Sequence, residues 1–213
     1  MKGKIAIYGA GGFGKEIYQM IDYINQQNEV WEFVGYFDGF LAPGTIINGF
    51  PVLGGTDTLN DYRESLALVI AIGKPKVVKE VAESIRNENI SFPNLIHPNV
   101  KYDLKYNKLG VGNIVCYGCY FTCDIVMGSF NIFNTRATIG HDTQIGSFNL
   151  FQPNVQISGE VKIGDFNFFG VNSCVLQQKK IGNNNTLGAG SLLLRNIKNN
   201  ARYFGNPAYE IKL

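Results

Sequence analysis

The sequence predicts two structural units: a small α/β domain with a Rossmann-like parallel sheet over residues 1–92, and an all-β left-handed parallel β-helix over residues 93–213. Two observations predict this division. In the first part, strand-like and helix-like segments alternate, which is typical of a parallel sheet covered by helices. In the second part, a large apolar residue recurs at every sixth position, which indicates a repeat architecture.

The first part contains three expected strands and two expected helices. Residues 4–8 and 33–37 are short apolar stretches, and 66–72 is wholly apolar, as a strand buried on both faces would be. Helices are expected over 15–25 and 76–89, where apolar residues recur at helical spacing. Those apolar positions are Ile17, Ile21, Ile24, Val77, Val81 and Ile85.

The second part keeps its six-residue repeat without a break, and an 18-residue period lies over it. Every third apolar position is followed by glycine and, three residues after that glycine, by asparagine. A β-sandwich or barrel would instead show period-2 alternation with turns every 8–12 residues. The repeat members are Leu109, Val115, Phe121, Met127, Phe133, Ile139, Ile145, Phe151, Ile157, Ile163, Phe169, Val175, Ile181, Leu187 and Leu193; the glycines are Gly110, Gly128, Gly146, Gly164 and Gly182; the asparagines are Asn113, Asn131, Asn149, Asn167 and Asn185.

Three hexads are expected to form one three-sided coil, with about five coils between residues 109 and 198. The apolar series should point inward and stack coil on coil. The asparagines should form a ladder of amides. The glycines are expected where a corner demands an unusual backbone conformation.

Composition and charge exclude several classes of protein. The formal net charge is +2 and no basic run stands out, so no nucleic-acid partner is expected. No run of about 18 apolar residues occurs, and the apolar segment 5–7 is too short for the core of a signal peptide. We therefore expect a cytoplasmic protein without a membrane partner.

Four cysteines are present, three of them close together. The spacing of Cys116, Cys119 and Cys123 suggests zinc, but a second ligand pair at metal spacing is missing and neither histidine lies beside the cluster. We expect no metal. With Cys174, these residues are interpreted as reduced, structural cysteines.

Six motifs follow one another along nearly the whole chain. In this order, and with the hexad phase, they resemble the hexapeptide-repeat sugar acetyltransferases. The resemblance is to the branch that joins a nucleotide-sugar-binding α/β domain to a left-handed β-helix, which includes UDP-amino-sugar and perosamine N-acetyltransferases and sialic acid O-acetyltransferase-like proteins. The motifs are Ile7–Lys15, Val34–Asp38, Ala71–Gly73, Asn94–Pro98, Asn134–Asp142 and Phe204–Ala208.

His141 is the candidate general base. It stands two positions after an inward residue, so it should face outward near a corner. An amine that attacks a thioester must lose a proton, and a neutral imidazole, whose ordinary pKa is about 6.5, can accept it. The resemblance implies this role. Direct attack of the substrate on the thioester suffices, so Cys174 and the cysteine cluster need no nucleophilic role.

Asp142 is the candidate partner that orients His141. Neighbouring residues of a strand point to opposite faces, so contact between the two side chains requires a bend. An aspartate at a coil corner could equally be a turn residue.

The loop Gly9-x-Gly11-x-x-Gly14, with Asp38 at the end of the second strand, fits the dinucleotide-binding fingerprint. Alone it would suggest NAD, but N–H groups at the start of a helix bind any phosphate. The resemblance implies a nucleotide-linked sugar as the ligand, and Phe13 stands where many members of the family carry histidine. The implied substrate-binding positions are Gly11, Gly12, Phe13, Asp38, Gly73 and Lys74.

The resemblance also implies acetyl-CoA as co-substrate, lying along the coils in a homotrimer. At Leu150 and Ala189, members of the family carry histidine and glycine. The glycines in this set could also be simple coil corners. Outward aromatic residues such as Tyr117 and Phe168 fit subunit packing. The implied cofactor contacts are Leu150, Gly159, Val171, Gly188 and Ala189.

The leading function is acetyl-CoA-dependent N-acetylation of a nucleotide-linked amino sugar for surface polysaccharide or glycan biosynthesis. O-acetylation of a sugar hydroxyl, as in the sialic acid type, is the competing enzymatic hypothesis, because His141 suits both. Two hypotheses from different classes are a non-catalytic β-helix binding protein and an NAD oxidoreductase. His97, followed by Pro98, is interpreted as structural.

Overall fold

The computed structural model describes residues 2–211. Its contacts divide the chain into two compact units, Met1–Pro98 and Asn99–Leu213, and each is described by itself. This division, between Pro98 and Asn99, falls six residues after the domain boundary expected at residue 92, which stays a prediction. No helix within residues 2–211 is long and apolar enough to cross a membrane.

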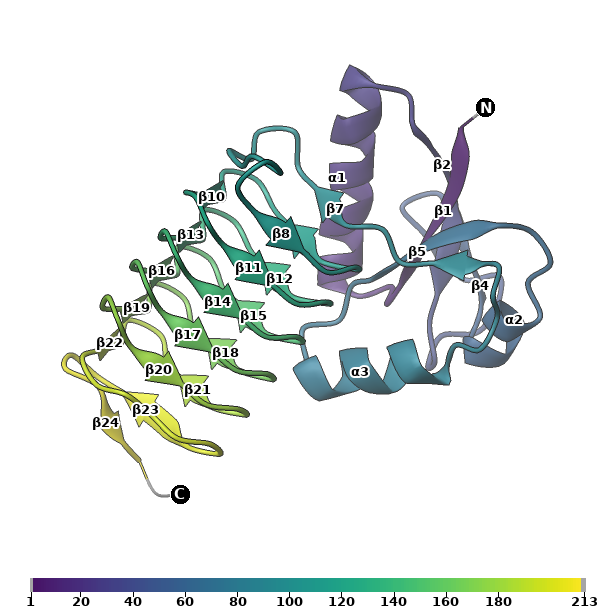
Figure 1. The fold of residues 1–213 in the computed structure, drawn as a ribbon. Helices are drawn as coiled ribbons and strands as arrows, with labels where there is room; N and C mark the ends of the chain where they lie inside the picture. The colour runs from purple at the N-terminus through teal and green to yellow at the C-terminus, as the bar shows by residue number, and fades with distance from the viewer. Residues whose placement is uncertain (1, 212–213) are drawn as a thin grey trace. The chain divides into compact units, whose positions relative to one another are not determined.

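Unit 1 is built on a sheet in the order β3-β4-β2-β1-β5-β6 (Figure 1). The pairs are parallel as predicted, except that β3 and β4 form an antiparallel hairpin at the edge, which the sequence did not indicate. The central β1 and β5 are almost entirely buried, in keeping with their apolar sequences. The strands are β1 (Gly3–Tyr8), β2 (Trp31–Phe37), β3 (Ile46–Ile47), β4 (Phe50–Gly54), β5 (Leu66–Ile70) and β6 (Ile90–Ser91), and β7 (Leu95–Ile96) follows.

Helices α1 (Gly12–Gln27), α2 (Thr56–Asn60) and α3 (Pro75–Ser84) accompany the sheet. The end of α3 differs from the predicted residue 89, and Asn60 supplies the reason. Its side-chain amide donates to the carbonyl oxygen of Ser84 (3.0 Å) and its side-chain oxygen accepts from the N–H of Arg86 (2.8 Å). These bonds hold the chain in an extended conformation at Ile85, so the helix cannot continue.

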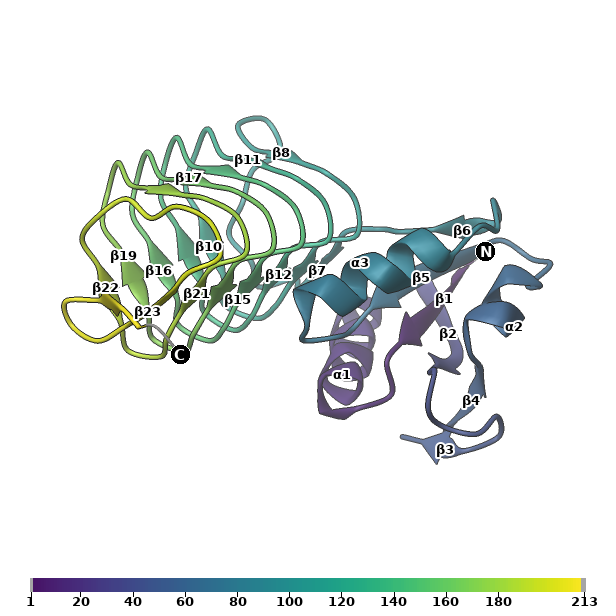
Figure 2. The ribbon, with the colours of Figure 1, turned by 90° about the horizontal axis from the view of Figure 1, so that it is seen from below.

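Unit 2 is a parallel β-helix, whose coils appear as stacked rungs in Figure 1 and as successive loops in Figure 2. Its faces carry β10-β13-β16-β19-β22, β20-β17-β14-β11-β8 and β24-β23-β21-β18-β15-β12-β9. Strands pair with the strand one coil later, 18 residues on, as Thr138 does with Gln156. The strands are β8 (Lys108–Leu109), β9 (Ile114–Val115), β10 (Tyr120–Phe121), β11 (Val126–Met127), β12 (Ile132–Phe133), β13 (Thr138–Ile139), β14 (Gln144–Ile145), β15 (Leu150–Phe151), β16 (Gln156–Ile157), β17 (Lys162–Ile163), β18 (Phe168–Phe169), β19 (Cys174–Val175), β20 (Lys180–Ile181), β21 (Thr186–Leu187), β22 (Leu192–Leu193), β23 (Arg202–Phe204) and β24 (Tyr209–Glu210).

The hexad series forms the core, as predicted. All of its members except the half-exposed Leu109 are at most 5% exposed. Like residues stack along the axis: the ring centroids of Phe133, Phe151 and Phe169 are 4.6 and 4.7 Å apart, with nearly parallel planes. This stacking buries a continuous apolar column without gaps between coils.

The predicted asparagine ladder is also confirmed. The side-chain oxygen of Asn131 accepts both the backbone N–H (2.9 Å) and the side-chain amide (3.0 Å) of Asn149. Asn149 accepts the same pair from Asn167 (2.8 and 3.0 Å), and the pattern also joins Asn113 to Asn131 and Asn167 to Asn185. These amides are buried, so the ladder satisfies polar groups that would otherwise destabilise the core.

The prediction for the five repeat glycines is wrong. None of them has a positive φ; instead, a Cβ on Gly128 or Gly146 would lie 2.8 Å from the carbonyl oxygen of the glycine one coil later. Close backbone approach, and not conformation, therefore requires glycine there.

The left-handed conformation occurs at another position of each hexad, where most residues are not glycine. Phe130, Phe148 and Phe166 occupy it with φ between 57° and 61°, and their rings stack in parallel 5.2–5.3 Å apart. Such a conformation is unfavourable for a bulky residue, so the coil geometry imposes it. The corner residues are Gly112, Gly118, Asp124, Phe130, Arg136, Asp142, Phe148, Asn154, Glu160, Phe166, Asn172, Gln178, Asn184 and Gly190.

The last coil is shorter than the others. Leu187 pairs with Tyr203, which is 16 and not 18 residues later. The chain then reverses, and β24 runs antiparallel to β23.

Candidate functional site

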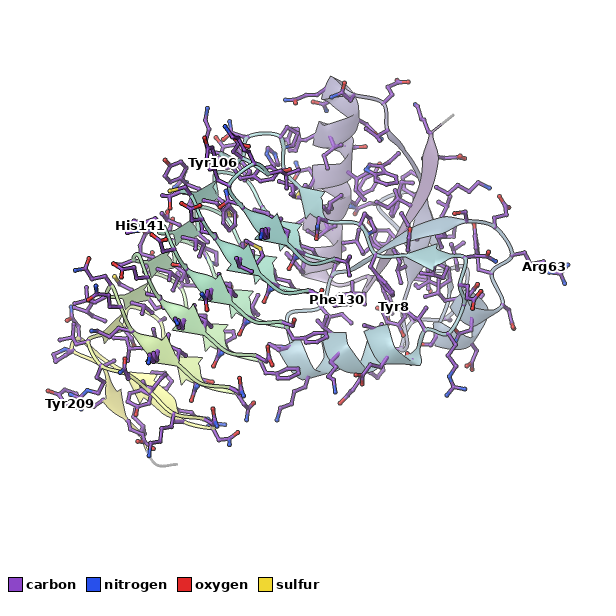
Figure 3. All side chains as sticks on the ribbon, viewed as in Figure 1. Tyr8, Arg63, Tyr106, Phe130, His141 and Tyr209 are labelled. Carbon is purple, nitrogen blue, oxygen red and sulfur yellow. The ribbon has the colours of Figure 1, made fainter. Side chains whose placement is uncertain are left out.

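His141 lies on the outside of the β-helix, where Figure 3 shows its side chain directed away from the coils. It follows β13 and immediately precedes the corner residue Asp142, and its side chain is 54% exposed. The φ of 56° at Asp142 supplies the bend that contact between neighbouring side chains requires. As a result, Nδ1 of His141 lies 2.8 Å from Oδ2 of Asp142.

This contact determines which imidazole nitrogen can act as a base. An ionised carboxylate only accepts hydrogen bonds, so Nδ1 of His141 must carry the proton that Asp142 accepts. Nε2 is then the unprotonated nitrogen. The carboxylate also stabilises the positive charge that forms when Nε2 accepts a proton.

The backbone around the pair is fixed from both neighbouring coils. The N–H of Asp142 donates to the carbonyl oxygen of Cys123 (3.1 Å), and the N–H of Glu160 donates to the carbonyl oxygen of His141 (2.7 Å). The buried Thr143 hydroxyl bonds the carbonyl oxygen of Ser158 at 3.3 Å. The pair therefore sits on a rigid platform, which preorganises it.

Gly159, one coil after His141, lies directly against the imidazole. A Cβ at this position would be 2.5 Å from Nε2 and 2.7 Å from Cε1 of His141. Any side chain at residue 159 would therefore displace the ring. The sequence predicted Gly159 as a cofactor contact and contained no sign that its absent side chain makes room for His141.

The other predicted cofactor positions are distributed over the β-helix. Val171 (40% exposed) and Ala189 stand at the same corner on consecutive coils, with the buried Gly188 beside them. Leu150, in contrast, is only 3% exposed, so within the chain it offers little surface to a ligand. These contacts stay predictions.

In unit 1, the predicted substrate residues gather at one edge of the sheet, where β1, β2 and β5 end. Gly9 needs its φ of 107°, and Gly14 packs so closely on the carbonyl oxygen of Gly9 that no Cβ would fit. Gly11 and Gly12, in contrast, have open space around them. The loop therefore exposes its backbone at the start of α1, where helical N–H groups favour an anion.

The same edge holds Asp38, Gly73 and Lys74. Lys74 precedes α3, so a second helix begins here, and both Gly73 and Lys74 are exposed. Oδ2 of Asp38 accepts the N–H of Ala10 (2.9 Å) and its Oδ1 accepts those of Phe40 (2.8 Å) and Leu41 (3.2 Å). Sequence reasoning assigned Asp38 to the ligand and missed that backbone groups occupy most of its carboxylate.

Cys119 and the second histidine have structural surroundings, whereas Cys123 is exposed. Burial raises the pKa of the Cys119 thiol to about 12, and its sulfur contacts the carbonyl oxygen of Asn134 at 3.1 Å. Burial lowers the pKa of His97, whose ring packs edge-on against Tyr23. Within residues 2–211, no group of three His, Cys, Asp or Glu side chains is placed to hold a metal ion.

Known proteins resemble both units. Residues 4–85 match the family described as the PglD N-terminal domain. A GDP-perosamine N-acetyltransferase of Escherichia coli O157:H7 is 27% identical over 140 residues, which are 65% of this chain and 62% of that protein, so the match spans less than two thirds of the relative's length.

Two solved structures match almost the whole chain. One is the acetyltransferase domain of PglB from Neisseria gonorrhoeae FA1090 in complex with acetyl coenzyme A, with a TM-score of 0.90 and 28% identity over 99% of this chain and 100% of that one. The other is PerB from Caulobacter crescentus in complex with CoA and GDP-perosamine, with a TM-score of 0.90 and 27% identity over 99% and 98% of the two chains.

An α/β unit with an open glycine loop, followed by a parallel β-helix that carries an exposed His–Asp pair, is typical of the class of hexapeptide-repeat acyltransferase-type proteins. Within that class, the chain is similar to the hexapeptide-repeat sugar acetyltransferases that carry a PglD-type N-terminal domain, which confirms the resemblance that the sequence predicted.

Proposed function

We propose that the chain is an acetyl-CoA-dependent acetyltransferase that acts on the amino group of a nucleotide-linked amino sugar, in surface polysaccharide or glycan biosynthesis. The observation that carries the proposal is the His141–Asp142 pair on the corner of a β-helix coil, with Nδ1 and Oδ2 2.8 Å apart. The relatives support the choice of an amine, since one is a GDP-perosamine N-acetyltransferase and another is bound to CoA and GDP-perosamine.

The reaction follows from the state of the imidazole. The amine nitrogen of the sugar attacks the thioester carbonyl carbon of acetyl-CoA, and Nε2 of His141 accepts the proton that the nitrogen loses. The new C–N bond forms and the C–S bond breaks. The departing thiolate of CoA takes a proton from the imidazolium, which returns the pair to its starting state. Asp142 stabilises the imidazolium between these steps.

The predicted binding residues other than Asp38, whose carboxylate is largely occupied by backbone N–H groups, have a place in this proposal. Gly11, Gly12, Phe13, Gly73 and Lys74 would hold the nucleotide sugar, because they surround the open start of α1 or precede α3. Gly159, Val171, Gly188 and Ala189, with Leu150 as the least accessible, would contact acetyl-CoA.

A homotrimer and a cytoplasmic location belong to the same proposal. Unit 2 has several exposed apolar side chains, including Tyr117, Tyr120 and Val126, which a subunit interface would cover. Light scattering of the purified protein tests this directly, and a monomer would contradict it.

The test of activity is acetyl-CoA turnover, followed by release of free thiol, against UDP-, GDP- and dTDP-linked 4-amino sugars. We expect turnover on one of them, reduced about 100-fold or more in His141→Ala, because general-base catalysis contributes roughly 10²–10⁴-fold. His97→Gln is the matched control, since His97 is the other histidine of the chain and packs on Tyr23. Turnover only on sugar hydroxyls would show that the acceptor is a hydroxyl group and that the reaction is O-acetylation. Failure to bind acetyl-CoA, or tight binding of NADH, would overturn the proposal.

A further inference from the structure

Phe40 is the most exposed large apolar side chain in residues 2–211: its whole surface (100%) is open to solvent, whereas the next, Leu104, is 66% exposed. Single exposed apolar residues are common on proteins, so exposure alone means little. The position of Phe40 is what gives it meaning. It follows β2 by three residues, at the edge of the sheet where the glycine loop begins.

Asp38 fixes Phe40 to that loop. One carboxylate oxygen accepts the N–H of Phe40 (2.8 Å) and of Leu41 (3.2 Å), and the other accepts the N–H of Ala10 (2.9 Å). Charge-assisted hydrogen bonds of this kind are among the stronger ones in proteins. The segment that carries Phe40 and the first residues of the glycine loop are therefore held by a single side chain.

The topology places the nucleoside end of a ligand at this point. In open parallel sheets, ligands bind beyond the carboxyl ends of the strands, with phosphates at the first helix and the ribose near the end of the second strand. Here α1 begins at Gly12 and β2 ends at Phe37. A base attached to that ribose would extend past Asp38, where Phe40 stands.

We infer that Phe40 is a stacking platform for the nucleobase of the nucleotide sugar, and that Asp38 is the positioning residue that holds it. The inference rests on the proposed function, because it names how the same substrate is recognised. Every base has a flat π-face, so an aromatic ring adds affinity without selecting one base. Phe40 therefore explains binding strength, and discrimination between bases must come from other groups.

The test is calorimetric binding of UDP and of GDP to the full-length protein and its variants. Phe40→Ala should lower the affinity for both nucleotides by about 5-fold to 100-fold, as loss of a base–aromatic stack does. The Phe40→Tyr variant should bind both nucleotides with the affinity of the parent. Phe40→Leu keeps an apolar side chain of similar bulk but has no π-face, so it should bind them almost as weakly as Phe40→Ala does. Ile46→Ala, at another exposed apolar residue of unit 1, is the matched control and should change neither affinity.

The role of Asp38 is tested by a double-mutant cycle. If Asp38 acts through Phe40, Asp38→Asn weakens nucleotide binding in the parent but has much less effect in the Phe40→Ala background. A carboxylate that contacts the ligand itself, or that only stabilises the fold, would have the same effect in both backgrounds, and that result would overturn the positioning role. Denaturant unfolding of each variant, measured in parallel, shows whether it is folded.

Two further outcomes separate this inference from the proposed function. Parent-like affinity of Phe40→Ala for a nucleotide that the parent binds would overturn the stacking role and leave the acetyltransferase proposal intact. A parent protein that binds neither UDP, GDP nor dTDP would overturn both.

Discussion

Replacement of Gly159 by alanine should disable the proposed base without unfolding the protein. The new Cβ would lie 2.5 Å from Nε2 of His141, whereas ordinary contact begins at 3.4 Å, so the ring must move by about 0.9 Å (3.4 minus 2.5). The imidazole is an exposed side chain and can yield, and Gly159 has no positive φ that alanine would strain. The free energy of unfolding should therefore change by less than about 1 kcal/mol.

The catalytic loss should be much larger than the loss of stability. A misplacement of about 1 Å at a reacting group can reduce the rate by about 100-fold. We expect kcat of Gly159→Ala to fall by about that factor, with the KM for acetyl-CoA nearly unchanged. The assay is steady-state thiol release at varied acetyl-CoA, together with denaturant unfolding of the same variant.

Two results would refute this reasoning. Parent-like kcat would show that the ring tolerates the Cβ in a productive position. An increased KM for acetyl-CoA with kcat retained would instead assign Gly159 only to the cofactor contact that the sequence predicted. Gly146→Ala provides the contrast, because its Cβ would meet backbone atoms at 2.8 Å, so it should lower stability and not kcat selectively.

Three further predictions concern the pair, the ladder and the thiols. Asp142→Asn should lower kcat by about 10- to 100-fold and leave the free energy of unfolding unchanged. Asparagine also tolerates the left-handed conformation, but it cannot stabilise an imidazolium as a carboxylate does. Parent-like kcat would contradict the role of Asp142 beside His141. Asn149→Ala should lower the free energy of unfolding by about 2–4 kcal/mol, measured by denaturant unfolding, because the ladder loses partners for buried polar groups; an unchanged midpoint would refute this. In alkylation followed by mass spectrometry, Cys123, which is exposed, should react in the native protein, whereas Cys119, buried and with its pKa raised to about 12, should react only after unfolding; early labelling of Cys119 would contradict its burial.

The β-helix could be predicted from the sequence because its core residues recur at a fixed spacing. One inward residue follows another every six positions, so a single apolar series identifies every coil, and Asn149 and its counterparts identify the ladder in the same way. Local composition could not show that Gly146 serves close approach and that Phe148 adopts the left-handed conformation. The coil geometry decides both, whatever residue stands there.

The geometry of the candidate site could be predicted only in part. The sequence left open whether Asp142 reaches His141; the contact and the bend that it requires are present at the corner, and the roles of the two residues stay predictions. The fit of Gly159 against the imidazole joins residues 18 positions apart through side-chain orientation, which no local pattern records. The bonds of Asp38 to backbone groups likewise depend on how two loops meet.

The short last coil has a consequence for how this protein can evolve and associate. The end coil of a regular parallel β-helix has unpaired backbone groups. Further coils, from the same or another molecule, could pair with them one after another without limit. Here the spacing falls to 16 residues at Tyr203 and the chain reverses at β24, so an 18-residue parallel coil finds no matching register. The terminal segment thus acts as a stop to fibre growth. Whole 18-residue coils could be gained before it without disturbing either the stop or the coil that carries His141.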